Sequence, residues 1–309
     1  MSNQRRSTSA VIADWLAVIK QAKAPNTLKT YRTAAETFKL SLAKDKAIES
    51  LSEDDYELFL SRLKEMHPQT EKLYAIILAL FFEYLSAKSI CKINMDAIRF
   101  MRRNQTRKAG KRLRKIDMDA LHEIAEKVVS LKPGDDPVLA RAKCLVIWLV
   151  RSGLRAFEAV KVKTTDLDPR KGRGVTIGKG NKEAYFLLDD DMLDAMREYH
   201  RIREVRSEWV FLSHSRRHGK THSPIAYDTA RRDVMRIYGL LLENDPEFRI
   251  TPHQFRHFFV TEVYRETGDI KEAQTAARHD NIATTDRYIH DEEGAILRVG
   301  KTMKKARSK

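Results

Sequence analysis

A strongly basic stretch divides this chain of 309 residues. Eight of the fourteen residues from 102 to 115 are lysine or arginine, and none is acidic. A block of like charges repels itself and is a poor candidate for a packed core. The sequence on either side is long enough to bury a core of its own. We therefore expect two domains, residues 1–101 and residues 116–309, joined by a basic linker over residues 102–115.

The overall charge indicates what kind of partner this chain binds. The net charge is +15 and the isoelectric point is about 9.7. An excess of this size suits a protein that neutralises phosphates, although an anionic membrane surface or an acidic partner would also attract it. The linker has two corresponding interpretations, a solvated connection or a segment that lies against a polyanion. We favour the second, because its charge is unbalanced.

Several protein classes are disfavoured by the sequence. The longest apolar run, Cys144 to Val150, is far shorter than the roughly 20 residues that a membrane span needs. The first residues lead into no apolar stretch typical of a secretory signal. Cys91 and Cys144 are the only cysteines, which excludes a disulfide framework or a cysteine-rich zinc site. We expect a cytoplasmic protein with no membrane partner and no metal site.

The first hundred residues have the pattern of a helical bundle. Apolar residues recur at helical spacing over residues 12–21, 27–38, 56–63 and 69–87, and Asn26 is a candidate cap for the second of these helices. In the last helix the stripe comprises Leu73, Ile76, Ile77, Leu80, Phe81 and Tyr84. We expect these stripes to form the shared core of four or five helices.

The second half has the pattern of a mainly helical domain with a small β component. A helix with Leu121, Ile124, Val128 and Leu131 on one face precedes an apolar, buried helix over residues 138–150. Residues 174–178 and 184–188 predict a hairpin, and residues 209–213 are a candidate third strand. Ser223-Pro224 and Thr251-Pro252 are typical helix starts, and Gly268 is the expected end of the second of these helices.

Basic residues and one tyrosine in this half suggest phosphoryl transfer. Arg155 follows the buried helix, in Ser-Gly-Leu-Arg, and His253 and Arg256 lie three residues apart on a predicted helix, so they share a face near its N-terminus. Guanidinium groups donate paired hydrogen bonds to phosphate. Lys179 and Lys182 lie in the hairpin turn, where either could give a proton to a leaving oxygen, and spacing does not separate them.

Tyr288, in Thr-Thr-Asp-Arg-Tyr-Ile-His, is the candidate nucleophile. Its phenol has an ordinary pKa of about 10 and needs a helper to lose its proton, for which His279 or His253 is available. Taken singly, each of these residues has a more ordinary explanation in the core or on the surface. Their order along the chain is the specific signal.

This order resembles that of the tyrosine recombinases, the phage integrase and Xer-type family, over essentially the full length. The resemblance implies a helical, SAM-like core-binding domain at the N-terminus and an α+β catalytic domain after the linker. It assigns catalytic roles to Arg155, Lys179, His253, Arg256, His279 and the nucleophile Tyr288, with Glu158 as the acidic partner of Arg155. The family often has Leu-Gly-His where this chain has Ala277-Arg278-His279, so Arg278 is a departure that alters local packing or adds a phosphate contact.

The resemblance also implies a mechanism and its partners. Tyr288 attacks a DNA phosphate, a 3′-phosphotyrosine forms, and four protomers exchange strands between two sites through a Holliday junction, without ATP, metal or other cofactor. The DNA site is a short inverted-repeat core in double-stranded DNA. Accessory proteins are possible additional partners. A tail helix over residues 292–303 packs either on a neighbouring protomer or in cis. Candidate DNA-binding residues are Arg102, Arg103, Arg107, Lys108, Lys111, Arg112, Lys182, Arg231 and Arg232.

Three other functions remain open at this stage. A type IB topoisomerase or a telomere resolvase shares the nucleophile chemistry but does not join two sites. A catalytically inactive relative would bind DNA as an accessory factor. A basic helical RNA-binding protein would carry the motifs by coincidence. The compact two-domain layout favours a recombinase, and the biological role, whether integrase, resolvase or invertase, is not visible.

Overall fold

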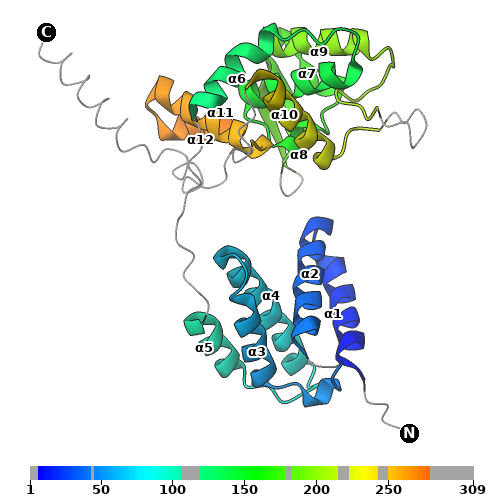
Figure 1. Ribbon diagram of the computed structural model, residues 1–309, viewed down its shortest axis with the longest axis vertical. Coiled ribbons are helices and arrows are strands. Elements are labelled where there is room, and N and C mark those ends of the chain that lie inside the picture. The colour runs from blue at the N-terminus through cyan, green and yellow to red at the C-terminus, as the bar shows by residue number, and fades with distance from the viewer. Residues whose placement is uncertain are drawn as a thin grey trace, which may run out of the picture. The chain divides into compact units, whose positions relative to one another are not determined.

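The computed structural model describes residues 6–42, 45–105, 118–178, 182–214, 223–242 and 250–278. The chain forms two compact units, Met1–Arg114 and Lys115–Lys309, and the division lies within the basic segment. The fold is mainly helical with a small sheet, as predicted from the sequence (Figure 1).

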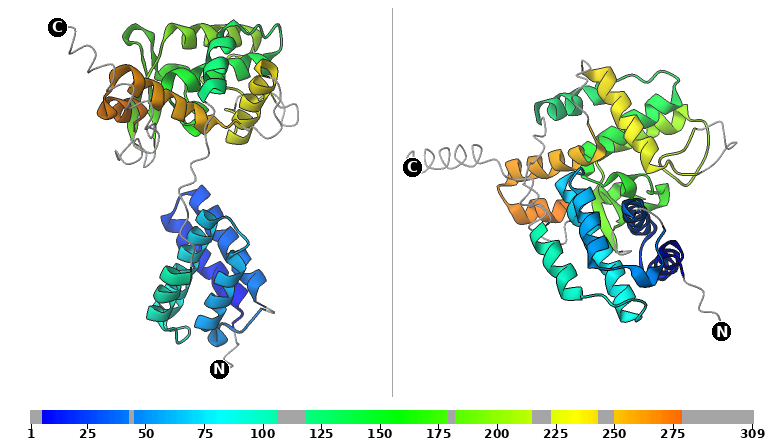
Figure 2. Two further views of the ribbon diagram at one scale, coloured as in Figure 1. Left: turned by 60° about the vertical axis from the view of Figure 1, so that its left-hand side comes forward. Right: turned by 60° about the horizontal axis from the view of Figure 1, so that its bottom comes forward.

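The first unit is a bundle of helices (Figure 2). Its helices are α1 (Thr8–Ala22), α2 (Pro25–Ser41), α3 (Glu53–Leu63), α4 (Pro68–Ala87) and α5 (Met95–Gln105), with a short 3₁₀ turn at Ile48–Ser50. Its core is aromatic: the Phe38 ring meets Phe59 edge-on at 5.6 Å and Phe82 at 5.8 Å between centroids. Edge-on pairs of this kind add stability beyond the area they bury.

Two details of this unit differ from the sequence prediction. Helix α2 begins at Pro25 and not after Asn26, because proline suits the first helical position and has no amide hydrogen that needs a partner. In α4, Leu73, Ile76 and Leu80 are exposed, while Ile77 and Phe81 are buried. The helix is apolar over most of its circumference, so only its neighbours decide which side enters the core.

Helix α5 was not predicted, and it changes the extent of the linker. It runs through Gln105, so Arg102 and Arg103 are helical residues. Ile98 and Met101 of this helix are buried in the core of the first unit. The first four residues of the expected linker thus belong to the bundle.

The second unit is built around α7 (Pro137–Ser152), whose residues from Ala140 to Val150 are buried. Asp136 caps its first turn through the amide of Val138. Helices α6 (Met118–Ser130), α9 (Asp190–Ile202), α10 (Tyr227–Leu241) and α11 (Pro252–Thr267) pack against it or against one another around it, and α12 (Ile270–Ala277) lies beside α11 (Figure 1). Helix α9 was not predicted.

A three-stranded antiparallel sheet completes the second unit. Its strands are β1 (Leu167–Asp168), β2 (Arg173–Ile177) and β3 (Glu183–Leu187), and the predicted hairpin is β2–β3 with Val175 opposite Tyr185. The prediction of a third strand over residues 209–213 was wrong. That segment makes only isolated bridges, from Trp209 to Lys163 and from Leu212 to Pro224. Because Pro224 is held in the latter bridge, α10 begins three residues later than predicted, at Tyr227.

Candidate active site

The turn between α7 and the short helix α8 (Ala156–Ala159) presents Arg155. Helix α7 ends at Gly153, which adopts a left-handed conformation with φ of 57°. A Cβ atom at this position would lie 2.2 Å from Cδ1 of Phe259, so glycine is required both by the backbone angle and by the neighbouring ring. Below the turn, the Ser152 hydroxyl donates to the Trp148 carbonyl and accepts from the Leu154 amide. These contacts fix the chain direction just before Arg155.

Glu158 holds Arg155 from beneath. The Glu158 carboxylate accepts a hydrogen bond from the Arg155 backbone amide at 3.0 Å and another from its guanidinium at 2.8 Å. The Glu158 side chain is buried, whereas 30% of the Arg155 side chain is exposed. The ion pair therefore orients the arginine and leaves part of its guanidinium open to a ligand.

Arg256 comes to the same turn from α11. This helix begins at Thr251, where Thr251 and Gln254 form a capping box ahead of Pro252, and it ends at Gly268, as predicted. Arg256 is fully buried, and its guanidinium donates to the Gly153 carbonyl at 2.6 Å and to the Ala277 carbonyl. The arginine thus joins three segments that are far apart in sequence.

His253 lies one turn earlier on α11 and is exposed. Its pKa is lowered below the ordinary value, first because the surrounding protein removes solvent from part of the ring and then because of the positive charges of Arg256 and Arg155. The imidazole is accordingly biased toward its neutral form, which can accept a proton. His253 and Arg256 are three residues apart on α11, so they share one face of that helix.

Arg278 is the residue that sequence reasoning undervalued. It follows α12, its side chain is 10% exposed, and its guanidinium donates to the carbonyls of Ser152, Gly153 and Ala276. Of the two roles considered for this departure from the family pattern, the geometry favours local packing, because the guanidinium points to carbonyl oxygens inside the unit. The separation of Arg278 from the turn in the sequence does not predict that its guanidinium contacts the Ser152 and Gly153 carbonyls.

The structure describes only some of the remaining site residues. Lys179, His279 and Tyr288 lie outside the described residues, as do four linker residues, Arg107, Lys108, Lys111 and Arg112, and the tail over residues 292–303. Lys182 immediately precedes β3, and its carbonyl accepts from the Gly178 amide. On α10, Arg231 and Arg232 are exposed, and the Arg232 guanidinium donates to the Asp228 backbone carbonyl and the Thr229 hydroxyl of its own helix.

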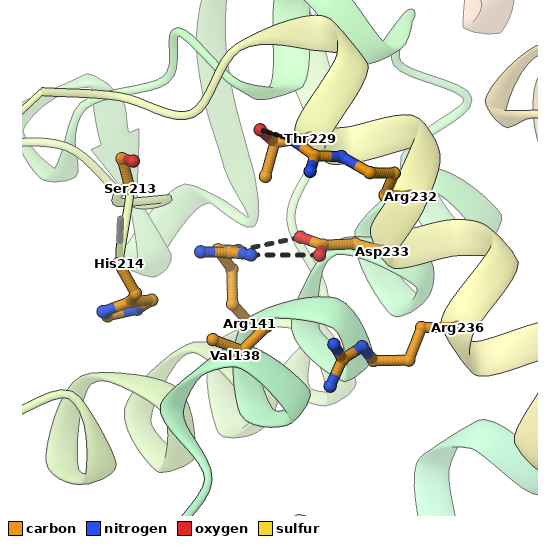
Figure 3. A pocket seen from close by; sticks show the side chains of 8 residues that line it. All are labelled: Val138, Arg141, Ser213, His214, Thr229, Arg232, Asp233 and Arg236. Carbon is orange, nitrogen blue, oxygen red and sulfur yellow. Dashed lines mark hydrogen bonds and ion pairs between the residues drawn. The ribbon is translucent and has the colours of Figure 1, made fainter. Parts of the chain in front are cut away.

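A basic pocket lies at the opposite end of α7 (Figure 3). It encloses about 330 Å³ and is lined by Val138, Arg141, Ser213, His214, Thr229, Arg232, Asp233 and Arg236. The buried Arg141 and Asp233 side chains pair across it through two hydrogen bonds of 2.8 and 3.0 Å. The α7 residues that line the pocket, Val138 and Arg141, lie 15 and 12 residues before Gly153. At ~1.5 Å per residue this is roughly 18–23 Å along the helix, so the pocket is separate from the turn that bears Arg155.

Two features are absent from the described residues. The described residues contain no group of three or more His, Cys, Asp or Glu side chains placed to hold a metal ion. Within the same part of the chain, no helix has the length and apolarity that a membrane crossing requires. The described chemistry of the site is that of clustered guanidiniums with one carboxylate and one imidazole.

Comparison with known proteins places this geometry in a family. Residues 111–294 match the model of the phage integrase family. The chain is 28% identical over 287 residues to the tyrosine recombinase XerD of Listeria innocua, a match that covers 88% of this chain and 90% of that protein. It is 25% identical to the tyrosine recombinase XerD of Proteus mirabilis, over 93% of this chain and 90% of that protein.

Solved structures show the same fold. A lambda integrase dimer bound to a COC′ core site superposes with a TM-score of 0.67 at 18% identity, over 93% of this chain and 96% of that one. XerH recombinase in a post-cleavage complex with difH DNA superposes with a TM-score of 0.65 at 19% identity, over 98% and 92% of the two chains. Since the family model matches more than half of the sequence, this chain belongs to the phage integrase family of tyrosine recombinases.

Proposed function

We propose that this protein is a site-specific DNA recombinase that cuts and rejoins strands through a covalent bond to Tyr288. The observation that carries the proposal is the meeting of Arg155 and Arg256 at the turn after α7, with His253 one helical turn before Arg256. Two guanidiniums and an imidazole in one neighbourhood suit a phosphodiester, whose non-bridging oxygens gain charge in the transition state. Membership of the phage integrase family supports the same chemistry.

The proposed reaction proceeds in two exchanges at phosphorus. The Tyr288 oxygen forms a bond to the phosphorus while the bond from phosphorus to the 5′-oxygen breaks, leaving a 3′-phosphotyrosine and a 5′-hydroxyl. The phenolic proton passes to His279 or His253, and the departing oxygen takes a proton from Lys179. A 5′-hydroxyl from the partner duplex then reverses these steps, so bond energy is conserved and no ATP or cofactor enters the balance.

In this proposal, Arg155 and Arg256 stabilise the charge on the phosphate in different ways. The exposed part of the Arg155 guanidinium contacts a non-bridging oxygen, held in place by Glu158. Arg256 is buried behind the turn, where its charge acts on the same phosphate and its hydrogen bonds fix the backbone. Such preorganised donors cost no reorganisation when the reaction occurs.

DNA binding in this proposal uses both units. The linker, α5 and α10 supply Lys and Arg side chains to phosphates, so affinity falls with salt at a slope of about −0.9 per contact. The partner is double-stranded DNA with a short inverted-repeat core, and the protein is DNA-associated in the cytoplasm. Assembly is a tetramer that passes through a Holliday junction, with the tail exchanged between protomers. A structure of a similar protein, lambda integrase, is a tetramer bound to such a junction.

Covalent trapping tests the proposal. The protein and a Tyr288→Phe control are each mixed with DNA that spans the gene's own locus, denatured in detergent, and the DNA-linked protein is captured so that the attached ends can be sequenced. We expect an adduct that depends on Tyr288 and maps to one short inverted repeat. Tight binding of the same DNA without an adduct would favour an accessory DNA-binding role.

A further inference from the structure

The residue after α12 has a backbone conformation that its side chain does not favour. Arg278 has φ of 56° and ψ of 46°, in the left-handed region that glycine or asparagine normally occupies. For another residue this conformation costs ~1–2 kcal/mol. Such a conformation persists only when the surrounding contacts determine it.

Most of the contacts that hold the Arg278 side chain lead to the turn bearing Arg155. One guanidinium nitrogen, Nη2, donates to the Gly153 carbonyl at 3.1 Å and lies 3.8 Å from the Glu158 carboxylate. The other, Nη1, donates to the Ser152 carbonyl at 3.3 Å and to Ala276 of its own helix end at 3.3 Å. The guanidinium thus ties the end of α12 to the end of α7.

The Gly153 carbonyl is shared between two arginines. It accepts from Arg256 at 2.6 Å and from Arg278 at 3.1 Å, while Arg256 also reaches the Ala277 carbonyl. A carbonyl has two lone pairs, so both bonds can be made at once. Two guanidiniums therefore fix the position of α12 relative to the turn after α7, and the next residue along the chain is His279.

We propose that Arg278 is a positioning residue for strand cleavage, which sets the end of α12 against the turn that carries Arg155. This inference rests on the proposed function. Arg278 acts through other residues, because its donors are directed at carbonyl oxygens. A small misplacement of reacting groups has a large effect on rate: a shift of ~1 Å costs on the order of 10²-fold.

The test compares Arg278→Gly with two other variants. Glycine accepts the left-handed backbone, so this change removes the guanidinium contacts without adding strain. Glu204→Gly is the matched control, because Glu204 has the same φ of 56° in the same unit and an exposed side chain. Arg278→Lys retains the charge but lacks the planar fork that serves two carbonyls.

DNA spanning the gene's own locus is used to measure, for each variant, DNA binding and the single-turnover rate of adduct formation with Tyr288. The thermal unfolding of each variant is measured in the absence of DNA. We expect Glu204→Gly to match the wild type. Arg278→Gly should bind DNA as the wild type does, form adduct on the order of 10- to 10²-fold more slowly, and recover rate when millimolar guanidinium is added. Arg278→Lys should remain slow.

Two results would overturn the inference alone: equal adduct rates in the wild type and Arg278→Gly, or a loss of rate that follows the loss of thermal stability and does not respond to guanidinium. Failure of the wild type to form any Tyr288-dependent adduct would instead remove the proposed function, and the positioning role with it.

Discussion

Gly153→Ala is the most informative single change, because it affects the point where the site residues meet. The new methyl group would lie 2.2 Å from Cδ1 of Phe259, and the backbone has φ of 57°. The Gly153 carbonyl also accepts from Arg256 and Arg278. Any displacement of the turn that relieves the clash therefore moves this acceptor away from at least one guanidinium.

The structure allows the cost to be divided into two parts. A left-handed alanine in place of glycine costs ~1–2 kcal/mol. Carbon atoms prefer ~3.5–4.0 Å of separation, so the Phe259 ring, packed against Val260, Ala273 and Ala277, must move. Overpacking of this kind costs ~1–3 kcal/mol. We expect a total of ~2–5 kcal/mol of lost unfolding free energy, which is the sum of these two ranges.

Gly134→Ala supplies the control for the backbone part. Gly134 has φ of 59°, and a Cβ atom there would have no heavy atom within 4 Å. Hydrogen exchange of α7 peptides at increasing urea concentrations gives the unfolding free energy of the second unit in each variant. We expect Gly153→Ala to lose ~1–3 kcal/mol more than Gly134→Ala and to form adduct more slowly. Equal losses in the two variants would refute the assigned clash with Phe259.

Three other changes test separate parts of the second unit. Asp233→Asn leaves the buried Arg141 without its ion-pair partner and should lower the unfolding free energy by ~3–5 kcal/mol. Asp194→Asn is the control: its ion pair with Arg197 is exposed, with side-chain exposures of 71% and 66%, so this change should have little effect in the same urea experiment. Burial, followed by the charge of a neighbouring arginine, lowers the pKa of His200 from 6.5 to about 4. As pH falls, the unfolded chain therefore binds a proton at His200 before the folded chain does, and the unfolding free energy should decrease from pH 6.5 toward pH 4. In His200→Gln, the urea midpoint should fall less over this pH range. An unchanged dependence of the midpoint on pH would contradict the prediction. Arg256→Lys cannot donate to both carbonyls as the guanidinium does, so it should bind DNA but cleave at least ~10²-fold more slowly in single-turnover assays, and a wild-type rate would remove Arg256 from the site.

Local signals in the sequence were sufficient for much of the second unit. Thr251 followed by Pro252 predicted the start of α11, and Gly268 predicted its end, because capping and left-handed termination depend on single residues. The hairpin followed from two short runs, residues 174–178 and 184–188, separated by the Lys-Gly-Asn-Lys-Glu turn. Strand β1, with only two residues, is too short for any periodic pattern.

Tertiary contacts account for what the sequence did not predict. Arg256 reaches a carbonyl 103 positions away in sequence, and Arg278 reaches one 126 positions away. No spacing rule covers such contacts, so the burial of Arg256 and the inward direction of Arg278 required the structure. The exposure of Leu73, Ile76 and Leu80 on α4 has the same origin, since the periodic pattern finds an apolar helix but not the partner that covers it.

The arrangement of charges links the stability of the site to its function. Among the described residues at the turn, the guanidiniums of Arg155 and Arg278 lie beside the Glu158 carboxylate, and that of Arg256 reaches the same turn through the Gly153 carbonyl. Like charges gathered in a partly buried site raise the free energy of the folded unit, and the left-handed Arg278 adds strain. Backbone carbonyls offset part of this cost by accepting hydrogen bonds from the two arginines that are not exposed. The exposed part of Arg155 keeps its capacity for an anion, so a phosphate bound there would relieve the excess charge that the fold already holds in place.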